Sequence, residues 1–130
     1  MKKWVLISGG NGVLGVAYAR ALEEDGYSVL SLDSRAPAKI DDPARAWFEC
    51  DITRDKDIER LGAHLRSLEG QVYGLVNNAS CQPQGFGNEL EDYSADTFRR
   101  VLDVNLTGSF LLTKLVIPMM KVPRRSLRKR

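Results

Sequence analysis

The sequence predicts an α/β fold, a doubly wound parallel sheet of about four strands in the order 3-2-1-4 with flanking helices. Short apolar segments alternate with segments of helical periodicity, the pattern of a parallel sheet covered by crossover helices. A glycine-rich segment joins the first strand to the first helix, and an acidic residue, Asp33, ends the second strand. Right-handed crossovers leave few arrangements, so a ligand crevice is expected where the strand order reverses, between strands one and four.

The first part of the chain predicts two strands and one helix. Residues 4–7 are a continuous apolar run, as in a strand buried on both faces. Apolar side chains recur at helical spacing over residues 13–25, and Gly26 is expected to end this helix. Residues 28–32 predict the second strand, and residues 35–45, which hold two prolines, predict a loop.

The alternation continues further along the chain. Residues 47–50 predict a third strand ending at Asp51, and residues 72–76 predict a fourth ending at an Asn-Asn pair. Between them, Gly70 stops a second helix. The apolar face of that helix consists of Ile58, Leu61, Leu65 and Leu68.

A loop over residues 81–88 precedes a long final helix. Ser94 is a favoured N-cap residue, and Pro118 is expected to mark or kink the helix end. The helix carries an apolar stripe that we expect to be partly buried. It consists of Phe98, Leu102, Leu106 and Leu112.

Length and composition favour a single globular domain over residues 1–121, followed by a basic, disordered tail over residues 122–130. The last ten residues hold six basic side chains, and the rest of the chain has 13 basic against 17 acidic residues. This tail has no aromatic residue and no nucleic-acid motif, so no nucleic-acid partner is predicted. The longest apolar stretches are far too short to span a bilayer, and no signal-peptide pattern is present. The prediction is a cytoplasmic protein without a membrane partner.

Cysteine and histidine usage predicts no metal site. Cys50 and Cys81 are two cysteines without metal-ligand spacing, so free thiols are expected. His64 is the only histidine, which leaves little support for a histidine-based metal site or a catalytic triad.

The segment Ser-Gly-Gly-Asn-Gly-Val-Leu-Gly over residues 8–15 has the features of a phosphate-binding turn. Amides at a helix start lie unpaired, and the helix dipole favours negative charge there. We expect Gly9 to permit the tight turn, Gly12 to let the backbone approach a phosphate, and Gly15 to let helix and strand pack closely. The turn therefore predicts a pyrophosphate at the amino end of the first helix.

Asp33 lies 24 positions after Gly9, at the tip of the second strand. A carboxylate there can accept hydrogen bonds from both ribose hydroxyls of an adenosine and would repel a 2′-phosphate. This favours NAD over NADP as the cofactor. Arg35 complicates the interpretation, because a guanidinium two residues further on could pair with a 2′-phosphate.

With these motifs the chain resembles the short-chain dehydrogenases/reductases over roughly residues 3–120. The glycine segment, Asp51-Ile52, Asn-Asn-Ala-Ser over residues 77–80 and Val104-Asn105 follow in that family's order. The resemblance implies a Rossmann-type fold and hydride transfer between a nicotinamide cofactor and a small alcohol or carbonyl substrate. Asn-Asn-Ala after the fourth strand is the most specific of these motifs.

The resemblance implies a role for each matching position. Ser8, a threonine in most of the family, would steady the turn through its hydroxyl. The pyrophosphate and its neighbouring ribose would meet Asn11, Val13 and Leu14. The adenine would meet Asp51 and Ile52, the nicotinamide-side ribose would meet Asn78 and Ala79, and Ser80 replaces a common glycine.

Asn105 matches the asparagine that helps to hold a proton-relay water in this family. Its residue type agrees, because asparagine is unfavourable inside a helix, by about half a kcal/mol against alanine. Such a side chain seeks a polar partner, which is often water.

The family's catalytic tyrosine and lysine, spaced Tyr-x-x-x-Lys, and its catalytic serine have no match in this chain. None of its four tyrosines, Tyr18, Tyr27, Tyr73 and Tyr93, has a lysine four residues later. We therefore expect a truncated family member with negligible turnover on its own. The alternative function is non-catalytic binding of NAD or ADP-ribose. An apolar fourth strand left at the sheet edge would also favour self-association into homo-oligomers or aggregates.

Overall fold

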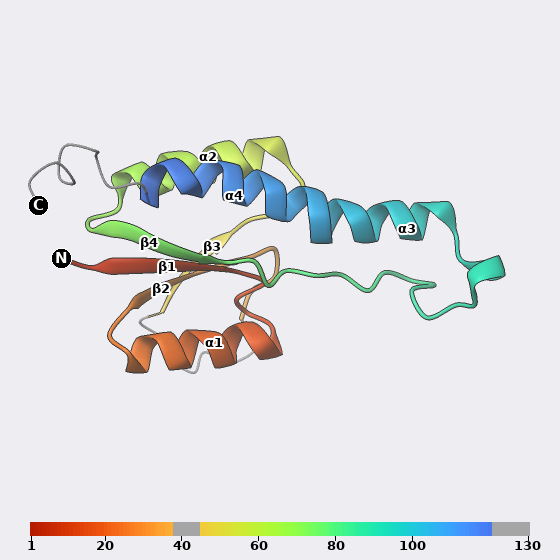
Figure 1. Cartoon of the computed structure of the whole chain (residues 1–130), viewed down its shortest axis with the longest axis horizontal. Coiled ribbons are helices and arrows are strands. Elements are labelled where there is room, and N and C mark those ends of the chain that lie inside the picture. Colours follow the sequence, from red (N-terminus) through yellow and green to blue (C-terminus); the bar gives the residue numbers. More distant parts are fainter. Residues whose placement is uncertain (38–44, 121–130) are drawn as a thin grey trace, which may run out of the picture.

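A computed structural model describes residues 1–37 and 45–120 of the chain. Strands and helices alternate along the described residues, except that β3 follows β2 with no described helix between them, and a 3₁₀ turn, Leu90–Asp92, precedes the last helical stretch. The elements, labelled in Figure 1, are β1 Lys3–Ser8, α1 Val13–Glu24, β2 Ser28–Asp33, β3 Ala46–Glu49, α2 Asp55–Ser67, β4 Gln71–Val76, α3 Ala95–Leu102 and α4 Ser109–Met120. A π-helical turn, Asp103–Gly108, joins α3 to α4 without a break.

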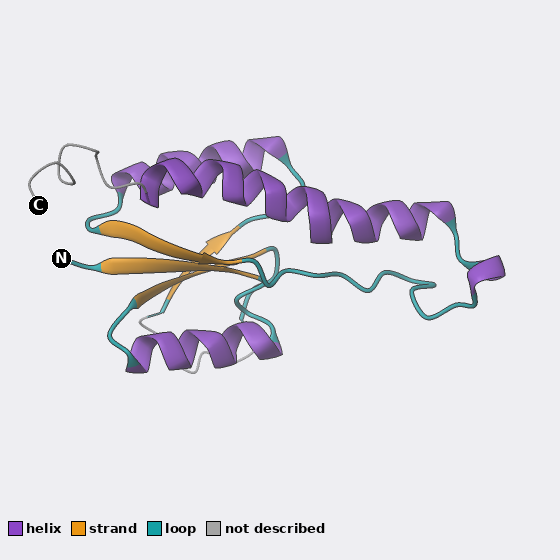
Figure 2. Ribbon diagram, viewed as in Figure 1, coloured by secondary structure: helices purple, strands orange, loops and turns teal. Residues whose placement is uncertain are grey.

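The four strands form one parallel sheet in the order β3-β2-β1-β4, which confirms the predicted topology. Val5 on the central strand pairs with Val29 of β2 and with Gly74 of β4. Helix α1 covers one face of the sheet, and α2 and α4 cover the other (Figure 2). The fold is therefore the doubly wound half-sheet that the alternation of elements predicts.

The core follows from the buried central strand. Successive residues of a strand point to opposite faces, so β1 needs apolar residues at every position when both faces are covered. Leu6 packs with the cluster that includes Leu61 and Leu112 from the two covering helices. Its neighbour Ile7 packs with Ala19 of α1 on the other face. Both β1 side chains are fully buried.

The long helix corrects the sequence analysis. Ser94 caps it as predicted, with its hydroxyl accepting from the amide of Thr97 at 3.0 Å. However, much of the predicted stripe faces solvent: Phe98 is 55% and Leu106 65% exposed. Of the predicted stripe, only Leu112 is buried; the other buried residues of the long helix are Thr97, Val104, Gly108 and Val116.

Two features of the helix explain this difference. The stretch formed by α3 extends beyond the carboxyl ends of the strands, where no sheet lies beneath it (Figure 1). The π-helical turn also adds residues per turn, so a stripe extrapolated at 3.6 residues per turn loses register there. The contact with the sheet begins only at the π-helical turn. Pro118 lies inside α4 rather than at its end.

The long helix also contradicts the prediction that no apolar stretch is long enough to span a bilayer. The helix Ala95–Met120 contains an 18-residue window of mean hydropathy 1.3, long and apolar enough by length and composition to cross a bilayer. Counting only unbroken apolar runs missed it. One such helix is weak evidence for a membrane span. Only 17% of the window is buried inside the structure, although Leu112 and Val116 of α4 are fully buried against the sheet.

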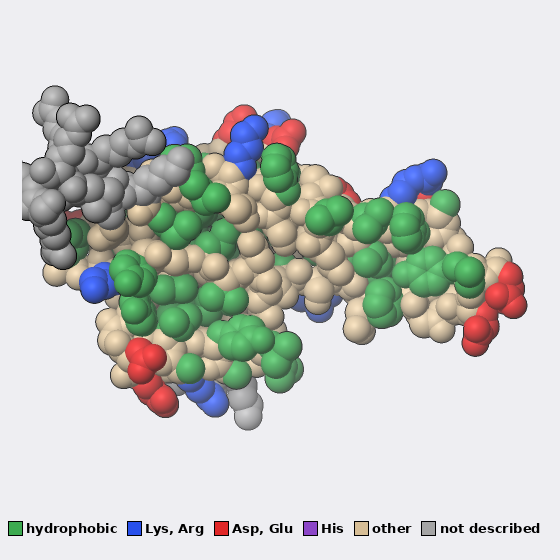
Figure 3. Space-filling view, in the orientation of Figure 1, with side chains coloured by type: hydrophobic (Ala, Val, Ile, Leu, Met, Phe, Trp, Pro, Cys, Tyr) green, Lys and Arg blue, Asp and Glu red, His purple; other side chains and the backbone are tan. Residues whose placement is uncertain are grey.

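Apolar side chains remain on the surface over two areas. Figure 3 shows them along the protruding helix and beside the sheet edge. Among the strands that the structure describes, β4 pairs with β1 alone, and Tyr73 on β4 is half exposed. The predicted loop over residues 35–45 is described only in part, and the predicted basic tail lies outside the described residues.

Leu106 and Leu112 both belong to the predicted stripe of the long helix, but only Leu112 is buried. Leu112→Ala should lower the free energy of unfolding by about 2–5 kcal/mol, because it empties a fully buried site. Leu106→Ala, at a site 65% exposed, should change it by less than about 0.5 kcal/mol. Urea unfolding of the two variants measures both. A loss at Leu106 as large as that at Leu112 would contradict the exposure of Leu106.

Candidate functional site

The turn between β1 and α1 is held to the end of β4 by a buried hydroxyl. Ser8, which has no exposed surface, accepts hydrogen bonds from the amides of Asn78 and Ala79, both at 3.0 Å. The side-chain amide of Asn78 donates back to the carbonyls of Ser8 and Gly9, at 3.1 and 3.2 Å. Ser8 therefore steadies the turn, as the resemblance implied. Asn78 and Ala79 lie against the turn at the point where the strand order reverses.

Three of the four glycines in the turn are required by space or conformation. Gly9 has a φ of +64°, which side-chain-bearing residues rarely adopt. A methyl group at Gly15 would overlap the carbonyl oxygen of Gly9, and one at Gly10 would overlap the Ser31 hydroxyl. Gly12 differs, because its φ is −80° and a methyl group there would lie 3.4 Å from the Gly9 oxygen. Only a ligand approaching Gly12 would demand a glycine at this position.

The turn leaves the first amides of α1 open. Among the described residues, the backbone N–H groups of Val13, Leu14 and Gly15 have no hydrogen-bond partner, and no side chain caps the helix. The side chains of Val13 and Leu14 are 91% and 60% exposed. No acidic residue occupies the first turn of the helix. This end of α1 therefore presents donors and the positive end of the helix dipole to an anion.

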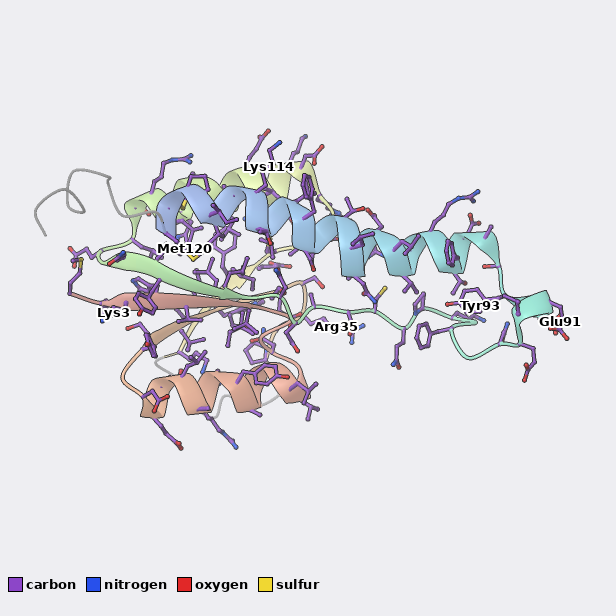
Figure 4. The ribbon with its side chains drawn as sticks, in the orientation of Figure 1. Lys3, Arg35, Glu91, Tyr93, Lys114 and Met120 are labelled. Atoms are coloured by element: carbon purple, nitrogen blue, oxygen red, sulfur yellow. The ribbon has the colours of Figure 1, made fainter. Side chains whose placement is uncertain are left out.

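Asp33 at the end of β2 faces this turn. One carboxylate oxygen accepts from the Asn11 amide and the other from the Arg35 amide, each at 3.0 Å. The Asn11 side chain donates to the Arg35 carbonyl at 2.6 Å and accepts from the Ser31 hydroxyl at 2.7 Å. Arg35 lies beside the turn, labelled in Figure 4. The backbone of the turn and the acid at the end of β2 thus form one hydrogen-bonded unit.

Asp51 follows β3 at the same edge of the sheet. Its carboxylate accepts from the amide and the hydroxyl of Thr53, at 3.0 and 2.6 Å. Partial burial raises the pKa of Asp51, but the two hydrogen bonds from Thr53, with the charges of Arg100 and Arg54, outweigh burial and hold the pKa below its usual value. Asp51 is therefore an ionised acceptor. Ile52 beside it is only 5% exposed and packs into the core, so little of its side chain faces outward.

Asn105 lies in the π-helical turn, and such turns within α-helices frequently occur at functional sites. Its side-chain oxygen accepts from the amide of Cys81 at 3.2 Å. The contact joins the helix to the segment after β4, which also holds the exposed Ser80. Gly108 at the end of the same turn packs so closely on Ile52 that a methyl group would lie 2.6 Å from its side chain. The π-helical turn is thereby fixed to the carboxyl edge of the sheet.

Three residues of this edge were not found from the sequence. The Ser31 hydroxyl donates to the Asn11 side chain, and the Thr53 hydroxyl donates to the Asp51 carboxylate. The Arg100 guanidinium donates in turn to the Thr53 hydroxyl at 3.3 Å. The Asp-Ile-Thr spacing could have indicated Thr53, because threonine two residues after an aspartate commonly closes such a turn. Nothing local to Ser31 or Arg100 indicated a role, since their partners lie 20 and 47 positions away.

The cysteines and acids give no sign of a metal centre. Within residues 1–37 and 45–120, no group of three or more His, Cys, Asp or Glu side chains is placed to hold a metal ion. Burial raises the pKa of the Cys50 thiol to about 12, so this cysteine stays protonated.

Comparison with known proteins agrees with this geometry. The short chain dehydrogenase family model matches residues 3–127. The L-fucose dehydrogenase of Bos taurus is 32% identical over an alignment of 126 residues, and the alignment covers 94% of this chain and 46% of that protein. The 2,5-dichloro-2,5-cyclohexadiene-1,4-diol dehydrogenase of Sphingobium indicum is 32% identical over an alignment of 120 residues, and the alignment covers 88% of this chain and 47% of that protein.

Solved structures show the same likeness. A short chain dehydrogenase from Leptospira borgpetersenii with bound NAD⁺ is 28% identical, with a TM-score of 0.79 over 91% of this chain and 46% of that one. An NAD⁺-bound xylitol dehydrogenase is 31% identical, with a TM-score of 0.77 over 91% of this chain and 48% of that one.

The match to the family model covers nearly the whole chain, and its fold is the dinucleotide-binding half-sheet of that family. The chain belongs to the short-chain dehydrogenase/reductase family. It spans about half the length of the curated relatives it matches.

Two glycines of the turn provide a matched test of its packing. Gly15→Ala should lower the free energy of unfolding by about 1–3 kcal/mol, because its methyl group meets fixed backbone. Gly12→Ser should leave stability unchanged or slightly raised, because the position is extended and serine is a favoured N-cap. Thermal unfolding followed by circular dichroism measures both. A Gly15→Ala variant as stable as the parent would contradict the close helix–strand contact.

Proposed function

We propose that this chain forms the dinucleotide-binding part of an NAD(P)-dependent short-chain oxidoreductase and binds the adenosine diphosphate portion of the cofactor. The observation that carries the proposal is the set of unpaired amides at Val13, Leu14 and Gly15 beside the fixed carboxylate of Asp33. The amides suit a diphosphate, and the carboxylate suits the hydroxyls of the adjoining ribose. Gly12 leaves room for the diphosphate to approach.

The remaining strand ends would hold the other parts of the dinucleotide. Asp51 would accept from the adenine amino group beside Ile52, and its lowered pKa keeps it an acceptor at neutral pH. Asn78, Ala79 and Ser80 would line the nicotinamide-side ribose at the crevice between β1 and β4. The nicotinamide, when bound, accepts or supplies the hydride.

NAD is the proposed form of the cofactor, rather than NADP. The Asp33 carboxylate is held at the end of β2. There the carboxylate would accept a hydrogen bond from the 2′-hydroxyl of NAD, and it would repel the 2′-phosphate of NADP. Arg35 is exposed, but its backbone is tied on both sides to Asp33 and Asn11. The NAD⁺-bound family structures are consistent with this choice.

For the whole protein, the proposed reaction is oxidation of a small alcohol or reduction of a carbonyl. Relatives include dehydrogenases of a sugar and of a cyclic diol. Asn105, fixed in the π-helical turn, is the one proposed catalytic residue in this chain, where it would help to hold a proton-relay water. The family's tyrosine, lysine and serine have no match here, so residues 1–130 alone should bind the nucleotide with negligible turnover.

The proposal includes the protein's surroundings. We propose a cytoplasmic protein with neither a nucleic-acid nor a membrane partner. Leu112 and Val116 of α4 are fully buried against the sheet and are not available to a bilayer. The exposed stripe of α3 and the free edge of β4 would favour self-association of this chain. The second candidate function is non-catalytic binding of NAD or ADP-ribose.

Asp33→Ala tests the nucleotide site directly. Titration calorimetry with ADP-ribose should show binding by the parent chain and about tenfold weaker binding by the variant, which loses two charge-assisted hydrogen bonds. Asp25→Ala, an exposed acid at the opposite end of α1, is the matched control and should bind like the parent. Equal affinity in all three chains, or no heat with the parent, would refute the proposed site.

A further inference from the structure

The polar groups around Asp33 form a closed ring that starts and ends at Asn11. The Asn11 amide donates to one oxygen of Asp33, and the Arg35 amide donates to the other. The Asn11 side chain then donates to the Arg35 carbonyl at 2.6 Å, the shortest of the three bonds. One side chain therefore closes the link between the glycine turn and the segment after β2.

The Asn11 side chain has only one orientation that satisfies its partners. A carbonyl only accepts, so Nδ2 of Asn11 must face Arg35 and Oδ1 must face Ser31. The Ser31 hydroxyl, 1% exposed beneath Gly10, donates to that oxygen at 2.7 Å. Because an unpaired buried hydroxyl is costly, Ser31 fixes the direction of the Asn11 amide.

The ring leaves Asp33 able to bind in one geometry. A carboxylate has about four lone-pair positions, and the ring occupies one on each oxygen. The remaining positions can receive two further donors whose directions are set by the two amides. Two neighbouring hydroxyls of a ribose are a donor pair of this kind.

We propose that Asn11 and Ser31 are positioning residues that orient the Asp33 carboxylate toward the ribose hydroxyls, with Asn11 acting through the Arg35 backbone. The inference rests on the proposed nucleotide site, and it gives the Asn11 side chain a role other than the pyrophosphate contact implied by the family resemblance. Asn11→Ala keeps the backbone bond to one oxygen of Asp33 but frees the Arg35 segment that holds the other.

Two ligands separate positioning from a general effect on the turn. One is ADP-ribose, and the other is its analogue lacking the 2′-hydroxyl on the adenosine ribose. The parent chain should prefer ADP-ribose by about tenfold. In Asn11→Ala and Ser31→Ala this preference should fall to about threefold or less, while affinity for the analogue stays within about twofold of the parent. Asn88→Ala and Ser67→Ala, at exposed sites on other elements, are matched controls that should keep the preference.

The same preference measured in an Asp33→Ala background completes the test. In that background, adding Asn11→Ala should not change the preference for ADP-ribose, because the effect of Asn11 on this preference passes through the Asp33 carboxylate. Two results would overturn the positioning role while leaving the nucleotide site in place. In one, Asn11→Ala weakens the binding of both ligands by the same factor. In the other, Asn11→Ala changes the preference as much in the Asp33→Ala background as in the parent chain. A parent chain that binds neither ligand would instead overturn both proposals. Ser31→Ala, which removes only one oxygen atom, gives the answer if Asn11→Ala fails to fold.

Discussion

The close contact between the start of α1 and the carbonyl of Gly9 is the constraint on which the rest of the site depends. Gly15 can pack there only because it has no side chain, and Gly9 can turn the chain only at positive φ. Together they set the amino end of α1 directly against the carboxyl end of β1. That placement leaves three backbone donors of the helix open at the edge of the sheet. Had the turn been longer or wider, the donors would not face the point where the strand order reverses.

The other strand ends are joined to this turn by polar contacts rather than by apolar packing. Ser8 binds the segment after β4, Asn11 binds the end of β2, and the Cys50 amide donates to the Asp33 carbonyl to hold the end of β3. Each contact involves a residue at the carboxyl end of a strand or in the segment directly after it. The carboxyl edge is consequently a connected set of donors and acceptors, while the two faces of the sheet pack into the two apolar clusters. A site assembled in this way is arranged before any ligand arrives.

Much of this fold could be predicted from the sequence, because its signals are local. Apolar runs located all four strands, and the handedness of crossovers then gave their order. The buried face of the long helix could not be predicted by extrapolation, since the π-helical turn at Asn105 changes the repeat and α3 runs past the sheet. The glycine turn and Asp33 were found from spacing, but Ser31 was not, because its partner Asn11 becomes a neighbour only when β1 and β2 pair. The cofactor contacts assigned to individual residues remain predictions.

The central claim is that a nucleotide diphosphate binds the open amides at the amino end of α1. The most direct measurement is an NMR titration of the ¹⁵N-labelled chain with ADP-ribose, following every assigned backbone amide. We predict that the largest changes in amide chemical shift occur at Val13 and Leu14, with smaller changes in the turn before them and at the end of β2. Shifts concentrated on other elements, with these two amides unchanged at saturation, would contradict it.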